Sequence, residues 1–192
     1  TSFHLEAADG SALPTFRPGQ FLVFKIPSDD AKGYVLRNYS LSGAPDDLSH
    51  YRISVKRAPS AGPGLPVGFS SNYLHDSIGV GDVLTADGPR GEFVLDEVSD
   101  RPVVLLSGGV GLTPMVAMLH ALAHRSARRT LFLHACENGD VHALRDEVNG
   151  LIGQRPGLLA HYCYRAPSDE DRVASRFDSE GFTTRDVMQS LL

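Results

Sequence analysis

The stretch from Val103 to Leu122 constrains the fold of this chain more than any other. It begins with a fully apolar run of strand length, Val103 to Leu106, which is typical of a strand in the middle of a parallel sheet. A glycine-rich turn follows, from Ser107 to Pro114, and apolar residues then recur at helical spacing. A strand, a glycine turn and a helix in this order predict an α/β unit whose turn can receive a nucleotide pyrophosphate.

The glycines of this turn allow the backbone to bend sharply and to come close to a ligand. The match to the pattern Gly-x-Gly-x-x-Gly is partial, because Pro114 replaces the last glycine. No Gly-Lys-Ser/Thr ending is present, which argues against a triphosphate-binding loop. Thr113 is predicted to be the N-cap of the helix and Pro114 to occupy its first position.

The rest of this half continues the α/β pattern. A second strand, Leu131 to Cys136, ends at Glu137, which is placed where an acid can hold a ribose hydroxyl or can simply be a solvated loop residue. We then expect a helix over 141–151, a third strand over 158–164, a polar loop over 165–181 and a short helix over 183–192. Three strands make a narrow sheet, and the last helix leads to no further strand. The α/β domain is therefore expected to be C-terminally incomplete.

The first half has a different pattern, in which short alternating segments are separated by Gly, Pro and Asp turns. This spacing predicts a six-stranded antiparallel barrel. Its expected strands cover residues 1–5, 21–26, 37–42, 51–57, 79–84 and 88–93. The polar segment 96–102 carries the change of pattern, so the sequence predicts a β-barrel domain over 1–98 and an α/β domain over 101–192.

The segment Val35 to Ser42 alternates apolar and polar residues and is predicted to present Arg37, Tyr39 and Ser40 on a polar face. Arginine matches phosphate oxygens with a planar fork of donors. Tyrosine offers a flat ring for stacking, and a serine hydroxyl can bond a ring nitrogen. Taken alone, however, this strand is more typical of a sheet edge with solvated polar groups.

A short helix is predicted to begin near Gly68, with Ser70 or Ser71 as its N-cap. The free N–H groups of a helix start can hold a phosphate. The local residues alone favour a plain capped helix that closes the end of the barrel.

Composition excludes several classes of function. The chain has 192 residues, 42% of them hydrophobic and 21% charged, and its net charge of −5 argues against a nucleic-acid-binding surface. We find no segment long and apolar enough to cross a membrane and no signal sequence, and we expect a cytoplasmic protein. The two cysteines form no Cys-x-x-Cys pair, so we expect no metal site.

Five motifs stand in order along the chain. They are Arg37-Asn38-Tyr39-Ser40, Ile53 to Arg57, Gly68 to His75, Gly88-Pro89-x-Gly91-x-Phe93, and Gly108 to Met115. Together they resemble the ferredoxin–NADP reductase-like flavoproteins, and most closely the reductase module of flavohaemoglobins. The segments 134–143 and 177–181 are similar to that branch in particular. Reductase modules fused to MOSC domains and to plant-type 2Fe–2S domains are similar as well.

The resemblance implies an FAD-binding first half and an NAD(P)H-binding second half. By this likeness Arg37 binds the flavin pyrophosphate, Tyr39 stacks on the isoalloxazine, Ser40 lies near its N5 atom and Thr113 lies near the flavin edge. The expected catalytic residues are Ser40 and Thr113. In the first half, the residues expected to contact a cofactor are Arg37, Asn38, Tyr39, Ser40, Val55, Lys56, Arg57, Gly68, Ser70, Ser71 and Asn72. In the second half they are Gly109, Val110, Gly111, Leu112, Thr113, Pro114 and Glu137.

The chain departs from the family pattern at several places. Phe21 stands where flavohaemoglobins usually have tyrosine, and Ala58 replaces an acid that often follows the Val-Lys-Arg strand. The family's last strand with its Cys-Gly-Pro segment is missing, as is the C-terminal aromatic residue. The FAD site is therefore expected to be nearly intact and the nicotinamide site incomplete.

The expected function is that of an NAD(P)H-dependent reductase module, which passes electrons through FAD to a haem or 2Fe–2S centre on another domain or protein. The alternatives are a flavin-binding module with little NAD(P)H activity and a cofactor-free interaction domain. FAD is favoured over FMN. NADH is favoured over NADPH, because Glu137 would repel a 2′-phosphate, although Arg165 could attract one.

Overall fold

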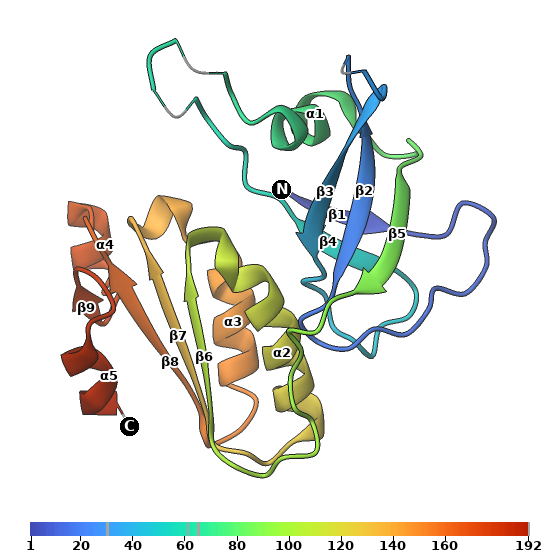
Figure 1. Cartoon of the computed structure of the whole chain (residues 1–192). Helices are drawn as coiled ribbons and strands as arrows, with labels where there is room; N and C mark the ends of the chain where they lie inside the picture. The colour runs from blue at the N-terminus through green and yellow to red at the C-terminus, as the bar shows by residue number, and fades with distance from the viewer. Residues whose placement is uncertain (30, 61, 65, 192) are drawn as a thin grey trace. The chain divides into compact units, whose positions relative to one another are not determined.

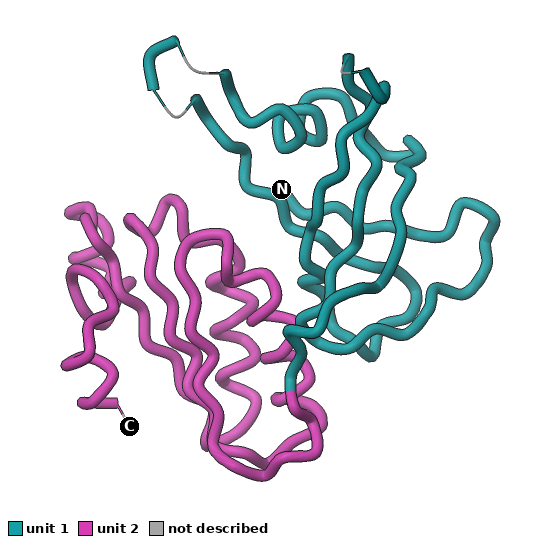
Figure 2. The backbone as a smooth tube through the Cα atoms, viewed as in Figure 1, with its two compact units in different colours: residues 1–95 teal, residues 96–192 magenta. Residues whose placement is uncertain are grey.

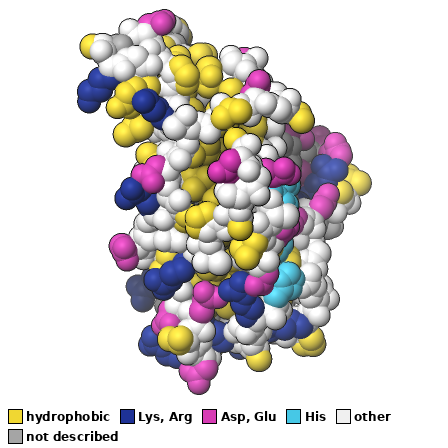
Figure 3. Space-filling view, turned by 90° about the vertical axis from the view of Figure 1, so that its right-hand side faces the viewer, with side chains coloured by type: hydrophobic (Ala, Val, Ile, Leu, Met, Phe, Trp, Pro, Cys, Tyr) yellow, Lys and Arg dark blue, Asp and Glu magenta, His cyan; other side chains and the backbone are white. Residues whose placement is uncertain are grey.

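The structure is a computed structural model that describes residues 1–29, 31–60, 62–64 and 66–191. The chain divides into two compact units, residues 1–95 and residues 96–192 (Figure 2). On the face drawn in Figure 3, acidic and basic side chains are interspersed, with hydrophobic side chains visible between them. None of the described helices combines the length and the apolar character that crossing a membrane requires.

In its described residues the first unit consists of antiparallel sheets and one helix, α1 (Phe69–Ser77). The strands form a two-stranded sheet, β1-β4, and a three-stranded sheet, β3-β2-β5 (Figure 1). A single antiparallel bridge joins Leu41 to Ile53 of β4. The strands are β1 (Ser2–Leu5), β2 (Phe21–Pro27), β3 (Tyr34–Ser40), β4 (Tyr51–Ser54) and β5 (Thr85–Arg90).

The central strand β2 shows why this segment folds as it does. Leu22, Phe24 and Ile26 are buried, whereas Lys25 between them is exposed, which is the alternation of a strand with one face on a core. Antiparallel sheets with one solvated face commonly have this pattern. The predicted antiparallel class is confirmed for this unit.

The predicted strand count differs from the structure, because the described part of the first unit has five strands. Residues 79–84 form a turn instead of a strand: Gly81 has a φ of +95°, and the Gly79 N–H donates to Asp82 Oδ2 at 2.8 Å. The strand predicted over 51–57 ends at Ser54, after which Val55 exchanges backbone hydrogen bonds with Thr1 at 2.8 and 3.2 Å.

The second unit is built on a parallel sheet, as the sequence predicted, with the strand order β6-β7-β8-β9. Figure 1 shows α2 and α3 lying along one face of this sheet. The strands are β6 (Val103–Gly108), β7 (Thr130–Cys136), β8 (Leu158–Tyr164) and β9 (Ser179–Glu180), and the helices are η1 (Gly109–Gly111), α2 (Leu112–Arg125), η2 (Gly139–Val141), α3 (Arg145–Ile152), α4 (Asp169–Val173) and α5 (Arg185–Leu191).

Several boundaries in this unit differ from the prediction. Helix α2 begins at Leu112 with Gly111 as its N-cap, two residues before the expected cap Thr113. Pro114 is thus the third helical residue, where its missing N–H still costs no intrahelical bond. The helix expected over 141–151 is divided, because Leu144 adopts a left-handed conformation with a φ of 57° between η2 and α3.

The segment expected to be a loop, 165–181, contains α4 and the fourth strand β9. Ser168 starts α4 with a capping box, in which its hydroxyl accepts from the Asp171 N–H and the Asp171 carboxylate accepts from the Ser168 N–H. The capping signal was present in the sequence, but the helix has only five residues and lacks the periodicity that identifies longer helices. The last helix ends at Leu191, and Leu192 lies outside the described residues.

Candidate functional site

Arg37 and Tyr39 lie on one face of β3, since they are two residues apart in a strand. Their partners across the sheet are Phe24 and Leu22 of β2. The Arg37 side chain is exposed and donates to the carbonyl of Leu36 at 2.7 Å. Among the described residues it has no carboxylate within salt-bridge distance, so its charge is available to an anion.

The ring of Tyr39 is half-buried and contacts Phe24 edge to face, with 5.7 Å between the ring centres. Burial raises the pKa of its phenol above the ordinary value, so the hydroxyl is neutral at physiological pH. A neutral ring packed on one side by the core and partly exposed on the other is suited to stacking against a flat ligand.

Asn38 and Ser40 alternate with Arg37 and Tyr39 and lie opposite Val23 and Phe21 of β2. The alternating pattern predicted Ser40 on the same polar face as Arg37 and Tyr39, and this prediction is wrong for the side chains. The reason is the pleat of the strand, which turns neighbouring residues to opposite faces. Ser40 is the last residue of β3 and is half-buried.

The start of α1 differs from the prediction, because Gly68 is its N-cap and no side chain caps it. Ser71 Oγ accepts from the Ala58 N–H and donates to the Gly68 carbonyl, both at 3.1 Å, and Asn72 Nδ2 donates to the carbonyls of Ala58 and Gly68. An added Cβ at Gly68 would lie 2.5 Å from the Ala58 Cβ. Glycine is therefore required here by the close approach of these two segments.

The buried hydroxyl of Ser70 has no hydrogen-bond partner in the part of the chain that the structure describes. Buried polar atoms without partners are uncommon and call for an explanation. Together with the uncapped N–H groups of α1, this hydroxyl leaves donors at the helix start that a phosphate can use.

Three residues predicted to contact a cofactor, Val55, Lys56 and Arg57, follow β4 and lie in different environments. Val55 is buried, and its carbonyl oxygen lies 2.9 Å from His75 Nε2. Lys56 is exposed. Arg57 makes a two-point salt bridge to Asp76 at 2.7 and 3.0 Å and a third bond to Asn72. A ligand can reach Arg57 only in competition with this acid.

In the second unit, the carboxyl ends of the parallel strands carry the predicted nucleotide residues. The glycine turn leaves β6 as η1, and Gly109 has a φ of +51°, which favours glycine. Val110 is half exposed, whereas Leu112 and Thr113 are buried. The Thr113 hydroxyl donates to the Val110 carbonyl at 3.1 Å, so it stabilises the turn from within.

Neither packing nor backbone conformation requires glycine at position 111. Its backbone is ordinary helical, with φ −62° and ψ −9°, and an added Cβ would meet no other described atom within 4 Å. Position 111 therefore opens onto space at the N-terminus of α2. A glycine that packing does not require fits a site where a ligand comes close to the backbone.

Glu137 directly follows β7 and forms a two-point salt bridge with Arg165, which directly follows β8, at 2.6 and 2.7 Å. Backbone bonds from Arg165 to Cys136 and from Ala166 to Glu137 extend the ladder past both strands. The acid predicted to hold a ribose and the arginine predicted to attract a 2′-phosphate are therefore partners of each other.

A buried polar cluster that was not predicted from the sequence lies beside these turns. Ser107 Oγ lies 2.9 Å from His134 Nδ1, and His142 Nδ1 lies 2.8 Å from the hydroxyl of Tyr164. The two imidazole rings are 4.8 Å apart between centres. The available signal was the presence of polar residues inside otherwise apolar strand patterns.

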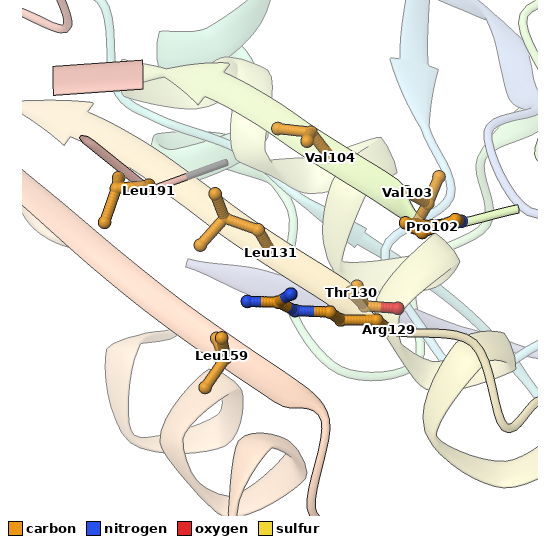
Figure 4. Close-up of a pocket in the computed structure, with 8 residues that line it drawn as sticks. All are labelled: Pro102, Val103, Val104, Arg129, Thr130, Leu131, Leu159 and Leu191. Atoms are coloured by element: carbon orange, nitrogen blue, oxygen red, sulfur yellow. The ribbon is translucent and has the colours of Figure 1, made fainter. Parts of the chain in front are cut away.

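A hollow of about 200 Å³ lies at the opposite ends of the strands (Figure 4). Val103 and Thr130 line it at the starts of β6 and β7, and Leu191 of α5 borders it. In parallel α/β sheets ligands bind at the carboxyl ends of the strands, so this hollow is not a nucleotide site. Among the described residues there is also no group of three His, Cys, Asp or Glu side chains placed to hold a metal ion.

The antiparallel unit and the parallel α/β unit each carry one set of candidate ligand-binding residues, and comparison with known proteins gives the family of the chain. Residues 2–95 match the oxidoreductase FAD-binding domain and residues 105–192 match the oxidoreductase NAD-binding domain. The chain belongs to the ferredoxin–NADP reductase-like flavoproteins, in the branch of the flavohaemoglobin reductase modules.

Individual relatives support this assignment. The chain is 40% identical over its full length to a flavohemoprotein of Bacillus thuringiensis and 43% identical over 94% of its length to one of Bordetella pertussis. It covers 47% and 44% of those proteins, so it spans about half the length of the curated relatives it matches. The flavohem-like FAD/NAD binding domain of nitric oxide dioxygenase from Vibrio cholerae superimposes with a TM-score of 0.82 at 35% identity, over 96% of this chain and 73% of that one.

Proposed function

We propose that this chain is a reductase module that passes electrons from NADH through FAD to a one-electron acceptor, a haem or a 2Fe–2S centre, on another domain or protein. Residues 1–98 form its FAD-binding part and residues 101–192 its NAD(P)-binding part. The observation that carries the proposal is Gly111, which the fold does not require to be glycine, at the strand–turn–helix junction of a chain from this oxidoreductase family. We retain the predicted cytoplasmic location as part of the proposal.

The residues of the first unit fit FAD. When bound, FAD would take a hydride from NADH and release single electrons to the acceptor. Arg37 offers an exposed and unneutralised guanidinium for the pyrophosphate, and Tyr39 offers a half-buried ring for the isoalloxazine. The uncapped start of α1, with Ser70 beside it, offers further donors to the pyrophosphate. We propose FAD rather than FMN, because FAD contains a pyrophosphate for these donors, whereas FMN has a single phosphate.

Ser40 and Thr113 are proposed to lie beside the reacting rings. The Thr113 hydroxyl is engaged with the Val110 carbonyl, so its contribution is to shape the turn that receives the nicotinamide dinucleotide. Hydride transfer needs no acid or base, and the role of the chain is to position the two rings and to exclude water. A steady-state assay with ferricyanide as acceptor tests the proposal: NADH oxidation that depends on added FAD supports it, and NADH oxidation at the background rate contradicts it.

Replacing Gly111 by alanine is expected to weaken NADH binding by about tenfold or more, because the new methyl group would occupy the space next to the helix N–H groups. The free energy of unfolding should stay the same or rise by about 0.5 kcal/mol, since the backbone at position 111 suits alanine. Calorimetric titration with NADH and urea unfolding measure the two effects.

The matched control for this prediction is Gly150→Ala in α3. An added Cβ there also meets no described atom within 4 Å, and we expect about 1 kcal/mol of stabilisation with unchanged NADH binding. Equal NADH affinity in the wild type and the Gly111 variant would contradict a nucleotide site at this turn.

We propose NADH as the preferred donor, because Glu137 both repels a 2′-phosphate and neutralises Arg165. The Glu137→Gln variant should raise the ratio of NADPH to NADH in kcat/KM by about tenfold, because the released guanidinium can bind the phosphate. The control is Glu180→Gln, which removes the acid from an equally exposed pair with Arg172. A ratio that changes equally in both variants would show that Glu137 does not select the donor.

A further inference from the structure

A row of polar side chains crosses the parallel sheet just below the glycine turn. Ser107 of β6, His134 of β7 and Tyr162 of β8 are in register as neighbours on adjacent strands, and all three are buried. The Tyr162 hydroxyl donates to Asn149 Oδ1 of α3 at 2.7 Å, so the row faces α3. Residues in register on adjacent strands share a face of the sheet.

His142, which follows η2, packs against this row. Its ring centre lies 4.8 Å from that of His134 and 4.6 Å from that of Tyr162. Hydrogen bonds join Ser107 to His134 and His142 to Tyr164, so that one continuous set of contacts connects β6, β7 and β8 with the loop after β7. We call Ser107, His134, His142 and Tyr164 the histidine network.

The composition of this network is unusual for the core of a sheet. The next row toward the strand starts is apolar, with Leu105 beside Phe132. In the network, by contrast, Nε2 of both His134 and His142 is buried and has no hydrogen-bond partner in the described part of the chain. Burying a polar atom without a partner is unfavourable, so packing alone would be served better by apolar residues.

The position of the network suggests what it does. Ser107 is the first residue of the glycine turn, which runs to Pro114, and His142 ends the loop 137–142, which begins with Glu137. These two segments are the proposed nucleotide-binding elements of the second unit. The network connects the start of the glycine turn to the end of the loop 137–142, on the side of the sheet that α3 covers.

We propose that the histidine network is a set of positioning residues that holds the glycine turn and the loop 137–142 in one arrangement, ready for the dinucleotide. This inference rests on the proposed nucleotide site and adds the residues that preorganise it. Preorganisation raises affinity, because a ligand that meets a rigid site does not have to order it. The network touches no ligand itself and acts through the backbone of both segments.

The test uses the full chain and ADP-ribose as the probe, with the dissociation constant measured by calorimetry. Ser107→Ala and Tyr164→Phe each remove one hydroxyl and should weaken ADP-ribose binding by about five- to tenfold. Ser107→Thr keeps the hydroxyl and should restore binding to near the wild-type value. In the double variant the combined loss should be smaller than the product of the single losses, because both hydroxyls act through the same pair of rings.

A stability control separates positioning from general weakening of the unit. Leu122→Val lies in the last turns of α2, far along the helix from the glycine turn, and should lower the melting temperature with unchanged ADP-ribose binding. Single variants that bind ADP-ribose as tightly as the wild type, or losses that simply follow the melting temperature, would overturn the inference. A wild-type chain that binds no ADP-ribose would instead contradict the proposed nucleotide site, and the inference with it.

Discussion

Replacing Arg37 by alanine is expected to lower the affinity for FAD by about ten- to hundredfold. Hydrogen bonds to charged groups contribute about 1.5–3 kcal/mol each, and 1.4 kcal/mol corresponds to a factor of ten in affinity. Arg37 is exposed on β3 and has no carboxylate partner among the described residues, so its charge is not already neutralised. Fluorescence titration with FAD measures the affinity.

Two variants sharpen this experiment. Arg37→Lys keeps the charge and loses the planar fork, so it should recover only part of the affinity. Arg17→Ala removes the same charge from an exposed turn of the same unit and should leave FAD binding unchanged. If Arg37→Ala and Arg17→Ala bind FAD equally well, Arg37 does not contact the cofactor.

The second unit is expected to lose stability steeply in weak acid. Burial lowers the pKa of His134 to about 4, and burial together with the neighbouring His134 and Arg145 lowers the pKa of His142 to about 3. The unfolded chain, with a pKa of 6.5 for both groups, binds more protons than the folded chain below that pH. The stability is therefore fully present above pH 6.5 and is lost as the pH falls towards 4.

For His134 alone, a pKa of about 4 instead of 6.5 corresponds to about 3 kcal/mol of unfolding free energy. Urea unfolding followed by the helical circular dichroism signal, at pH 7.5 and pH 4.5, measures the loss. His142→Gln should be less stable at pH 7.5 but should lose less on acidification, whereas His124→Gln, at an exposed position, should keep the wild-type difference. Equal losses in all three proteins would show that the buried histidines do not cause the acid sensitivity.

The sequence predicted those parts of the fold in which periodicity and turn chemistry agree. The apolar run at the start of β6, the glycine turn and the helical spacing of α2 all favoured one arrangement, and the parallel sheet was predicted correctly. The N-cap of α2 was not predicted correctly, because the Thr113 hydroxyl bonds the Val110 carbonyl within the turn and Gly111 takes the cap position. Elements of two to five residues, such as β9 and α4, carry too little periodicity to be identified.

The sequence indicated which residue types belong to the candidate site, but it did not predict how their side chains are arranged. The pleat separates Ser40 from Arg37 and Tyr39, which a motif written along the chain does not show. The pairing of Glu137 with Arg165 depends on two strands lying side by side, although 28 residues separate the two side chains in sequence. The histidine network depends on strand register in the same way, and register cannot be read from one strand alone.

The proposed function requires that this chain pass electrons from NADH to a bound flavin. The visible absorption spectrum of the FAD-loaded chain, recorded before and after addition of NADH without oxygen, tests this step. We expect the visible flavin absorption to bleach within the mixing time or shortly after it, because reduced flavin no longer has the spectrum of the oxidised cofactor. A flavin spectrum that persists under NADH would contradict the account and would support a flavin-binding module with little NADH activity of its own.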